Sequence, residues 1–210
     1  MPTSKILFLK EGQGGINPGD QLFIRNFIVD NSIKTVLEIG THLGASGLAI
    51  LDGLDLTGGI CFHTVDVLDV NSTSTKKYDK YKPEILPKDI FNKFKTPTTF
   101  FSKGSDVFFA ENKRKYDLIF VDGAHSKALA KKDIWNALKA VAVNGHIILH
   151  DYFPEGKPIW EGKIAIMGVY EAVEELIAEG VLIDVFPLNE LAYETKCGGK
   201  KTSLALLRKK

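Results

Sequence analysis

An apolar stretch that contains one acidic residue, Glu38, is followed by two glycines in the run Thr35-Val-Leu-Glu-Ile-Gly-Thr-His-Leu-Gly-Ala-Ser46. The β-branched residues predict a strand, the glycines predict a tight turn, and the residues after them predict a helix. A helix that begins behind a glycine turn presents free backbone N–H groups, which bind anionic or polar ligands. The spacing Gly40-x-x-x-Gly44 differs from the G-x-G-x-x-G pattern of dinucleotide sites. The run therefore predicts a ligand-binding loop with the carboxyl group of Glu38 beside it.

Two later apolar runs end in side chains that titrate. The first is followed by Asp122 and His125, and the second by His150 and Asp151. We expect the two strands to be neighbours, so that these groups meet at one edge of a sheet. Carboxylates with imidazoles can hold a divalent cation such as Mg²⁺ or Mn²⁺. His125 could instead cap the helix after it, and His150 could orient Asp151 rather than touch a metal.

Polar residues also end two other expected strands. Asp66 stands at the end of one of them, where a carboxylate can accept both hydroxyls of a ribose. The run Lys103-Gly-Ser-Asp106 follows the other strand, although Gly-Ser-Asp is also a common turn and helix cap. The sequence thus predicts a line of polar groups along the carboxyl ends of the strands.

Strand and helix patterns alternate, which predicts an α/β fold with a doubly wound sheet covered by helices on both faces. The expected strands are Thr35–Ile39, Ile60–Val67, Thr98–Ser102, Tyr116–Val121, His146–Leu149, Leu182–Phe186 and Ser203–Leu207. The expected helices are one that begins at Asn17-Pro18-Gly19-Asp20 and runs through Ile28, then Ala45–Leu51, Pro87–Lys95, Ser126–Val141 and Gly168–Ala178. The apolar side of 126–141 should carry Leu129, Ile134, Trp135 and Leu138. Residues 71–82 are expected to form a loop, and residues 156–166 a flap.

Composition narrows the class of protein. The 210 residues fit one domain, with 44% hydrophobic and 25% charged residues. Lys+Arg 27 against Asp+Glu 26 gives a formal charge of +1, so nucleic acid and anionic membranes are not expected partners. Cys61 and Cys197 lack the spacing of a zinc or disulfide framework. The apolar run Ile6–Leu9 is too short for a signal peptide, so cytoplasmic residence is expected.

From Thr35 to Tyr152 the chain resembles methyltransferase family 24, a group of class I S-adenosylmethionine-dependent methyltransferases. It is similar to enzymes that methylate sugars of macrolide antibiotics and, more distantly, to catechol-type O-methyltransferases. The resemblance implies a Rossmann-like, mostly parallel sheet with an antiparallel last strand, S-adenosylmethionine as methyl donor, and often Mg²⁺. Residues 1–210 then form a single methyltransferase domain, with an N-terminal helical extension (1–34), a donor-binding core (35–151), and a flap with closing strands (152–210).

The resemblance also assigns roles to residues. Donor binding is expected at Glu38, Gly40, Thr41, Gly44, Ser46, Asp66, Gly104, Ser105, Asp106 and Asp122. The metal is expected at Asp122, His150 and Asp151, and the general base at His125. The antibiotic-sugar enzymes carry an acidic pair where this chain has His150-Asp151, so a softer ion such as Mn²⁺ or Fe²⁺ is conceivable. The expected acceptor is a hydroxyl group of a small molecule or sugar.

Three alternatives stay open. The first is a methyltransferase without metal, in which Asp122 and Asp151 bind polar groups of the substrate. The second is a nicotinamide dehydrogenase, which the missing G-x-G-x-x-G disfavours, as does a separation of Asp66 from the glycines beyond the usual ~20 residues. The third is a protein that binds the donor without catalysis, although burying a cluster of titratable groups without a role is costly. Association into a homo-oligomer through the N-terminal helix Asp20–Val29 also remains open.

Overall fold

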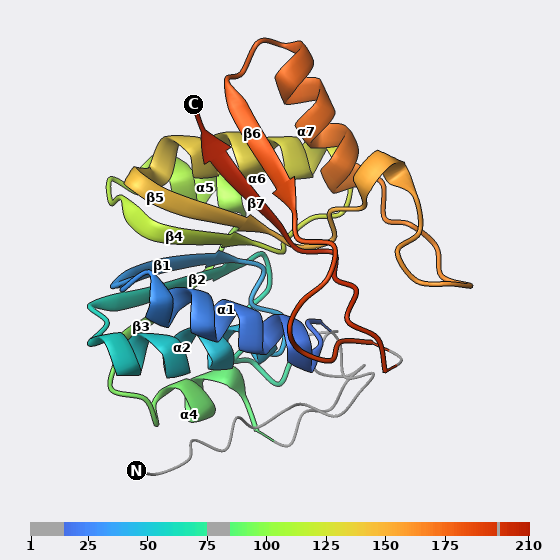
Figure 1. The fold of residues 1–210 in the computed structure, drawn as a ribbon. Helices are drawn as coiled ribbons and strands as arrows, with labels where there is room; N and C mark the ends of the chain where they lie inside the picture. The colour runs from blue at the N-terminus through green and yellow to red at the C-terminus, as the bar shows by residue number, and fades with distance from the viewer. Residues whose placement is uncertain (1–14, 75–84, 197) are drawn as a thin grey trace.

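Seven strands form one mixed sheet in the computed structural model, which describes residues 15–74, 85–196 and 198–210 (Figure 1). The strands are β1 (Thr35–Ile39), β2 (Cys61–Asp66), β3 (Thr98–Ser102), β4 (Tyr116–Val121), β5 (Val141–Leu149), β6 (Ile183–Pro187) and β7 (Ala205–Lys209). Their order is β3-β2-β1-β4-β5-β7-β6. The first five strands are parallel, and β7 is antiparallel to both of its neighbours. The doubly wound sheet with an antiparallel last strand is therefore confirmed.

Helices cover both faces of the sheet (Figure 1). One face carries α1 (Pro18–Asp30), α2 (Ala45–Thr57) and α4 (Pro87–Phe91), and the other carries α5 (Ser105–Glu111), α6 (Lys127–Ala140) and α7 (Gly168–Ala178). Each face has its own buried core, represented by Ile28 and Phe62 on the first and by Ile119 and Ile134 on the second. From β1 the chain builds one half of the sheet through β2 and β3, and it then returns to build the other half through β4 and β5. The strand order therefore reverses between β1 and β4, and a crevice opens at their carboxyl ends.

The boundaries of α1 and α2 follow from their end residues. The side chain of Asn17 accepts the N–H of Asp20, and a proline occupies the first turn of α1. Helix α2 begins behind Gly44 and continues to Thr57, so the expected end at Leu51 was wrong. Gly53 does not stop the helix, since a β-carbon there would lie 2.9 Å from a backbone oxygen of α1 and glycine permits this close packing.

Asn144-Gly145, just before the expected strand His146–Leu149, lies at an irregularity inside β5. Tyr116 pairs with Val141, and Leu118 pairs with His146, so the register shifts between these pairs. Asn144 has a φ of 62°, a left-handed conformation that asparagine tolerates. The strand therefore begins at Val141 rather than His146, with a bulge where the sequence indicated its start.

The expected apolar side of α6 was wrong in part. Leu129 and Trp135 are exposed, and Lys139 lies over the Trp135 ring at 4.7 Å. The buried side contains Ile134 and Leu138 together with alanines, so small residues rather than the largest ones face the sheet. The sequence indicated only a turn or helix cap where the short helix α5 begins.

Some expectations fall outside the described residues, namely residues 75–82 of the expected loop, Cys197 and the run Ile6–Leu9. The expected flap contains one short turn, η1 (Pro154–Gly156), and residues 157–167 form no helix or strand. Among the described helices, none has the length and apolar character needed to cross a membrane.

Candidate functional site

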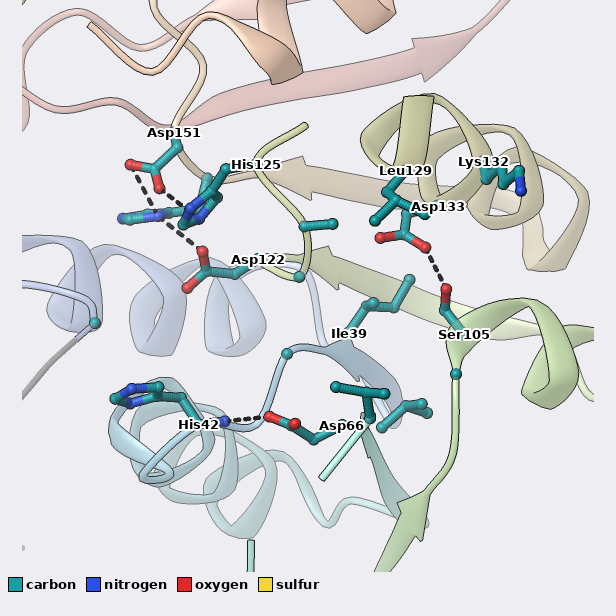
Figure 2. Close-up of a pocket in the computed structure, with 18 of the residues that line it drawn as sticks. Ile39, His42, Asp66, Ser105, Asp122, His125, Leu129, Lys132, Asp133 and Asp151 are labelled. Carbon is teal, nitrogen blue, oxygen red and sulfur yellow. Dashed lines mark hydrogen bonds and ion pairs between the residues drawn. The ribbon is translucent and has the colours of Figure 1, made fainter. Parts of the chain in front are cut away.

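A cavity of about 690 Å³ opens at the carboxyl ends of the parallel strands (Figure 2). Six of the residues expected to bind the donor line it: Gly40, Asp66, Gly104, Ser105, Asp106 and Asp122. The expected base His125 and the expected metal ligands His150 and Asp151 line it as well. Four expected donor residues lie behind the wall instead, and these are Glu38, Thr41, Gly44 and Ser46. The structure thus brings most of the expected site residues to one cavity.

Gly40 lies where the tips of β1 and β4 touch. Its φ is 100°, and a β-carbon there would lie 2.1 Å from the carbonyl oxygen of Asp122. Its N–H donates to the carbonyl oxygen of Val65 at 2.8 Å, which joins the turn to β2 as well. Only glycine meets both requirements, a left-handed backbone and the close approach of a neighbouring strand.

Glu38 supports the glycine loop from inside the protein. Its side chain is 0% exposed and accepts hydrogen bonds from Ser46 Oγ and Thr64 Oγ1, both at 2.5 Å. Burial raises the pKa of Glu38 to about 8, although these two hydrogen bonds act in the opposite direction. Thr41 Oγ1 lies 2.6 Å from Thr64 Oγ1 and extends the same network. The network links β1, β2 and the first turn of α2 behind the cavity wall.

Asp66 presents a fixed carboxylate to the cavity. Its Oδ2 accepts the backbone N–H of His42 at 2.9 Å (Figure 2), and its Oδ1 accepts that of Leu68 at 3.0 Å. His42 has a φ of 49°, so its backbone turns to donate this bond. The carboxylate is therefore oriented by neutral donors of the two loops that flank it.

Another part of the cavity wall contains a residue, Asp133, that the sequence did not indicate. Asp133 of α6 is buried and accepts the hydroxyl of Ser105 (Figure 2). Burial raises the pKa of Asp133. Asp133 lies inside a helical pattern, far in sequence from the strand ends, so no local signal marks it. Lys196 and Ile166 also line the cavity from the C-terminal segments without a signal in the sequence.

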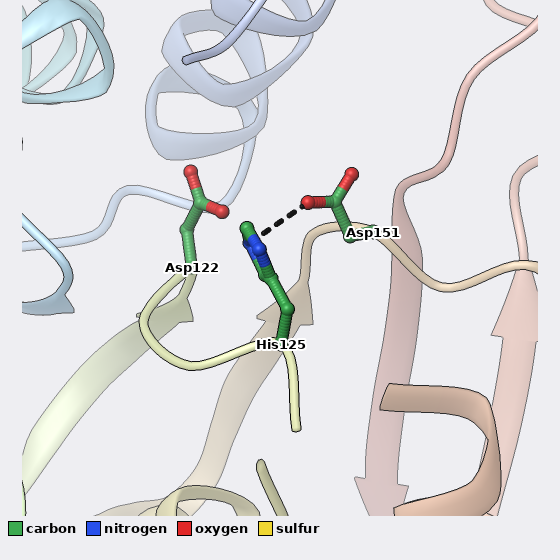
Figure 3. A group of neighbouring side chains, drawn as sticks. All are labelled: Asp122, His125 and Asp151. Atoms are coloured by element: carbon green, nitrogen blue, oxygen red, sulfur yellow. Dashed lines mark ion pairs between the residues drawn. The ribbon is translucent and has the colours of Figure 1, made fainter. Parts of the chain in front are cut away.

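Asp122, His125 and Asp151 form a cluster at the tips of β4 and β5 (Figure 3). One ligand atom from each of them lies within 4.8 Å of the others. His125 Nε2 lies 3.0 Å from Asp151 Oδ2, and the His125 side chain is 52% exposed. The hydrogen bond to Asp151 raises the pKa of His125 against the effect of burial. This cluster can exchange protons or hold a cation.

His150 faces the same carboxylates from the protein interior. Its Nδ1 lies 3.0 Å from Asp122 Oδ1 and 3.4 Å from Asp151 Oδ1. Burial alone would lower the pKa of His150, but the two carboxylates outweigh it and hold this pKa well above its usual value. Burial would likewise raise the pKa of Asp151, yet the imidazoles of His150 and His125 hold it well below its usual range.

The aromatic residues after β5 pack against the domain rather than line the cavity. The rings of Tyr152 and Tyr170 lie 5.8 Å apart, and those of Phe153 and Trp160 lie 6.1 Å apart. Lys196 lies over the Trp160 ring at 4.5 Å. These contacts anchor the segment after β5 beside the cluster.

Comparison with known families matches residues 37–152 to the model of a methyltransferase domain. The chain matches no protein of curated function by sequence. A solved O-methyltransferase of Bacillus cereus in complex with S-adenosylhomocysteine is similar in fold, with a TM-score of 0.62, 19% identity, and coverage of 93% of this chain and 83% of that chain. An O-methyltransferase of Streptomyces achromogenes involved in tomaymycin synthesis, in complex with S-adenosylmethionine, has a TM-score of 0.59 and 13% identity, with coverage of 92% of this chain and 80% of that chain. A putative caffeoyl-CoA O-methyltransferase of Staphylococcus aureus has a TM-score of 0.60 and 18% identity, with coverage of 94% of this chain and 86% of that chain. At these identities the solved structures establish the fold.

Proposed function

The chain belongs to methyltransferase family 24, and we propose that it transfers a methyl group from S-adenosylmethionine to a hydroxyl oxygen of a small molecule or sugar. One observation carries the proposal: a single cavity joins the glycine loop and Asp66 to the cluster of Asp122, His125 and Asp151. Its volume is within the usual range for small-molecule sites, and it lies where the strand order reverses. The O-methyltransferases of similar fold support the proposal because two of them hold the donor or its product.

In this proposal the donor lies along the β1–β3 side of the cavity. Asp66 accepts the two ribose hydroxyls, for which its oxygens are already oriented by backbone N–H groups. The backbone at Gly40 allows the sulfur-bearing part of the donor to approach without a β-carbon in the way. The turn at Gly104 and Ser105 lies where the adenine ring would extend.

Methyl transfer from a sulfonium is an in-line displacement, in which a C–O bond forms as the C–S bond breaks. Alignment of oxygen, carbon and sulfur can contribute on the order of 7–11 kcal/mol. The acceptor hydroxyl must also lose its proton. Asp151 can only accept a hydrogen bond, so His125 donates to it through Nε2 and keeps Nδ1 free to take that proton. His125 is the catalytic base of this proposal.

The cluster fits a divalent cation. Oxygen atoms of Asp122 and Asp151 lie within 4.8 Å of each other, and two carboxylates suit Mg²⁺, Mn²⁺ or Fe²⁺, which leaves His125 as the base. Asp122 and Asp151 would hold the ion, and His150 would orient both carboxylates from behind. A bound cation would lower the pKa of a hydroxyl group that it contacts.

A metal-independent methyltransferase is the second candidate. It is favoured by the contact of His150 Nδ1 with both carboxylates, since an imidazole already supplies a partner for their charge. Activity measured with and without a chelator, followed by addition of Mg²⁺ or Mn²⁺, separates the two candidates. Loss of turnover with chelator and recovery with the ion supports the metal, whereas unchanged turnover removes it from the mechanism.

The base is tested with His125→Asn in an assay that pairs labelled S-adenosylmethionine with a panel of hydroxylated acceptors. We expect turnover to fall about 10²–10⁴-fold, because general-base assistance is lost. Binding of S-adenosylhomocysteine should stay within about twofold. His146→Asn is the matched control, since His146 lies outside the cavity wall. Unchanged turnover in His125→Asn would remove the base. A wild-type protein that binds the donor but shows no turnover on any acceptor would favour a non-catalytic binding protein.

A further inference from the structure

The contact between His125 and Asp151 joins two separate loops. His125 lies in the loop after β4 and Asp151 in the loop after β5, and their side chains meet at 3.0 Å (Figure 3). Neither residue belongs to a strand or a helix. The paired registers of β4 and β5 end at Val121 and Leu149, so strand pairing alone does not fix the spacing of the two loops.

The beginning of α7 lies directly against the backbone of His125. A β-carbon at Gly168 would lie 1.9 Å from the carbonyl oxygen of His125 and 2.9 Å from the backbone nitrogen of Lys127. These are backbone atoms, which cannot turn aside as the end of a flexible side chain can. Gly168 is helical and has no left-handed φ, and glycine in a helix costs about 0.5–1 kcal/mol relative to alanine. The glycine is therefore needed for this close approach and not for the conformation of the helix.

The same turn of α7 also contacts the loop that carries Asp151. The ring of Tyr170 lies 5.8 Å from that of Tyr152, the residue directly after Asp151. Met167, which precedes the helix, packs against the short turn η1, where a β-carbon at Gly156 would lie 2.1 Å from the Cε atom of Met167. The first turn of α7 thus lies against both loops.

The rest of α7 is anchored in the domain core. Its buried side contains Val169, Ala172, Val173 and Leu176, which belong to the same core cluster as residues of β4, β5 and α6. The position of the helix is therefore set by the sheet and α6, and its first turn can act as a fixed support for the two loops.

We propose that Gly168 is a positioning residue, whose missing side chain lets α7 hold the backbone of His125 at the distance from Asp151 that aligns the base with the acceptor hydroxyl. The inference rests on the proposed function in one respect, the assignment of His125 as the base. Alignment of this kind matters because a displacement of about 1 Å can lower a rate about 10²-fold. Ile166 lines the cavity two residues before Gly168, so the support is continuous with the cavity wall.

Gly168→Ala tests the inference in the full chain, by NMR of isotope-labelled protein and by turnover of labelled S-adenosylmethionine on the acceptor panel. The signals of the peptide group between His125 and Ser126 should shift, because the new methyl group displaces it. We expect kcat to fall about 10²-fold, while the KM for the donor and the binding of S-adenosylhomocysteine stay within about twofold.

Gly53→Ala is the matched control. Gly53 is also helical, and a β-carbon there would lie 2.9 Å from the carbonyl oxygen of Arg25, on the other face of the sheet. This variant should lose stability but keep the wild-type signals at His125 and the wild-type turnover.

Met167→Ala is a second variant, which acts on the other loop without introducing a clash. Loss of the contact with Gly156 should shift the backbone signals of Asp151 and lower kcat by less than Gly168→Ala does. Ile177→Ala is its control, because Ile177 lies at the other end of α7 and is similarly exposed, at 44% against 39% for Met167. Its signals and turnover should match the wild type.

Contrary results have distinct meanings. A folded Gly168→Ala protein with wild-type signals at His125, or with shifted signals and unchanged turnover, overturns the positioning role. If this variant does not fold, wild-type signals and turnover in Met167→Ala overturn it instead. Equal losses of turnover in Gly168→Ala and Gly53→Ala would trace the effect to stability alone. A wild-type chain without turnover on any acceptor would contradict the proposed function, while the loop signals would still decide whether α7 sets the spacing.

Discussion

The two walls of the cavity hold their carboxylates in different ways. On the β1–β2 wall, Asp66 accepts from the backbone N–H groups of His42 and Leu68. On the β4–β5 wall, the carboxylates of Asp122 and Asp151 face imidazoles. Backbone N–H groups hold a carboxylate without exchanging protons with it near neutral pH, whereas an imidazole can gain or lose a proton there. The first wall is therefore suited to binding and the second to chemistry.

The contact between the walls is the most sensitive point, and Gly40→Ala breaks it. The new β-carbon would lie 2.1 Å from the Asp122 carbonyl oxygen at a φ of 100°, so the strand tips must separate. We expect the free energy of unfolding to fall by more than about 4 kcal/mol, with loss of donor binding. Denaturant titration measures the loss.

Gly180→Ala is the control for backbone strain alone. Gly180 has a φ of 84°, and a β-carbon there would meet nothing within 4 Å. Its cost should be limited to the left-handed backbone, about 1–2 kcal/mol. Similar losses in the two variants would show that Gly40 matters only for its own dihedral angles.

Asp151→Asn tests the chemical wall. Asparagine tolerates the φ of 54° at this position, so the loop should keep its conformation. We expect the pKa of His125 to fall, because its hydrogen bond to the Asp151 carboxylate is what raises it. Turnover should fall by up to about 10⁴-fold, and the pH at which the remaining activity appears should move down. NMR titration of His125 and a pH–rate profile check both effects.

Donor binding should survive this change. An Asp151→Asn protein that loses its affinity for S-adenosylhomocysteine would contradict the division between the two walls. Asp184→Asn is the matched control, since Asp184 pairs with Lys210 on the edge strand β6.

Glu38→Gln tests the buried network behind the binding wall through the pH dependence of stability. The folded chain keeps a proton on Glu38 up to a pKa of about 8, whereas the unfolded chain loses it near 4.5. Stability from this group is thus fully present below pH 4.5 and is lost as the pH rises through about 8. The wild type should lose up to a few kcal/mol relative to Glu38→Gln across this range, at about 1.4 kcal/mol per pKa unit. Unfolding curves at both ends of the range check it, and a constant difference would show that Glu38 is ionised in the folded protein.

Asp66→Asn should have the smallest effect on activity, and donor affinity is its specific readout. Losing charged hydrogen bonds to the ribose should weaken binding about 10–100-fold. The amide nitrogen of asparagine cannot accept, so one of the two backbone N–H groups also loses its partner, at a cost of about 1–3 kcal/mol in stability. Asp55→Asn is the matched control, because Asp55 also accepts two backbone N–H groups, those of Lys95 and Thr96, but lies outside the cavity wall. Equal donor affinities in these two variants would remove Asp66 from the donor site.

The binding wall was easier to predict from the sequence than the chemical wall. The glycine turn, its strand and its helix are neighbours in the chain, so local pattern and turn chemistry were sufficient to indicate them. Asp122, His125 and Asp151 were predicted to converge because adjacent parallel strands end at the same edge. Asp133 and Lys196 reach the site from a helix and a C-terminal segment whose approach depends on tertiary packing, and no local pattern marks them.

The same distinction explains the errors in the elements. Leu129 and Trp135 fit the helical period of an apolar side, but the packing of alanines against the sheet sets the rotation of α6. Asn144-Gly145 has the composition of a turn, yet pairing with β4 continues on both sides of it as a bulge. In both cases the contact with another element, rather than local preference, decided the outcome.

Titration calorimetry of the wild-type chain with S-adenosylmethionine and S-adenosylhomocysteine, at two temperatures, tests the central claim most directly. We expect saturable binding of one molecule per chain, with a negative heat-capacity change as apolar surface of the nucleoside is buried. A folded protein that shows no binding of either compound at both temperatures would contradict the account.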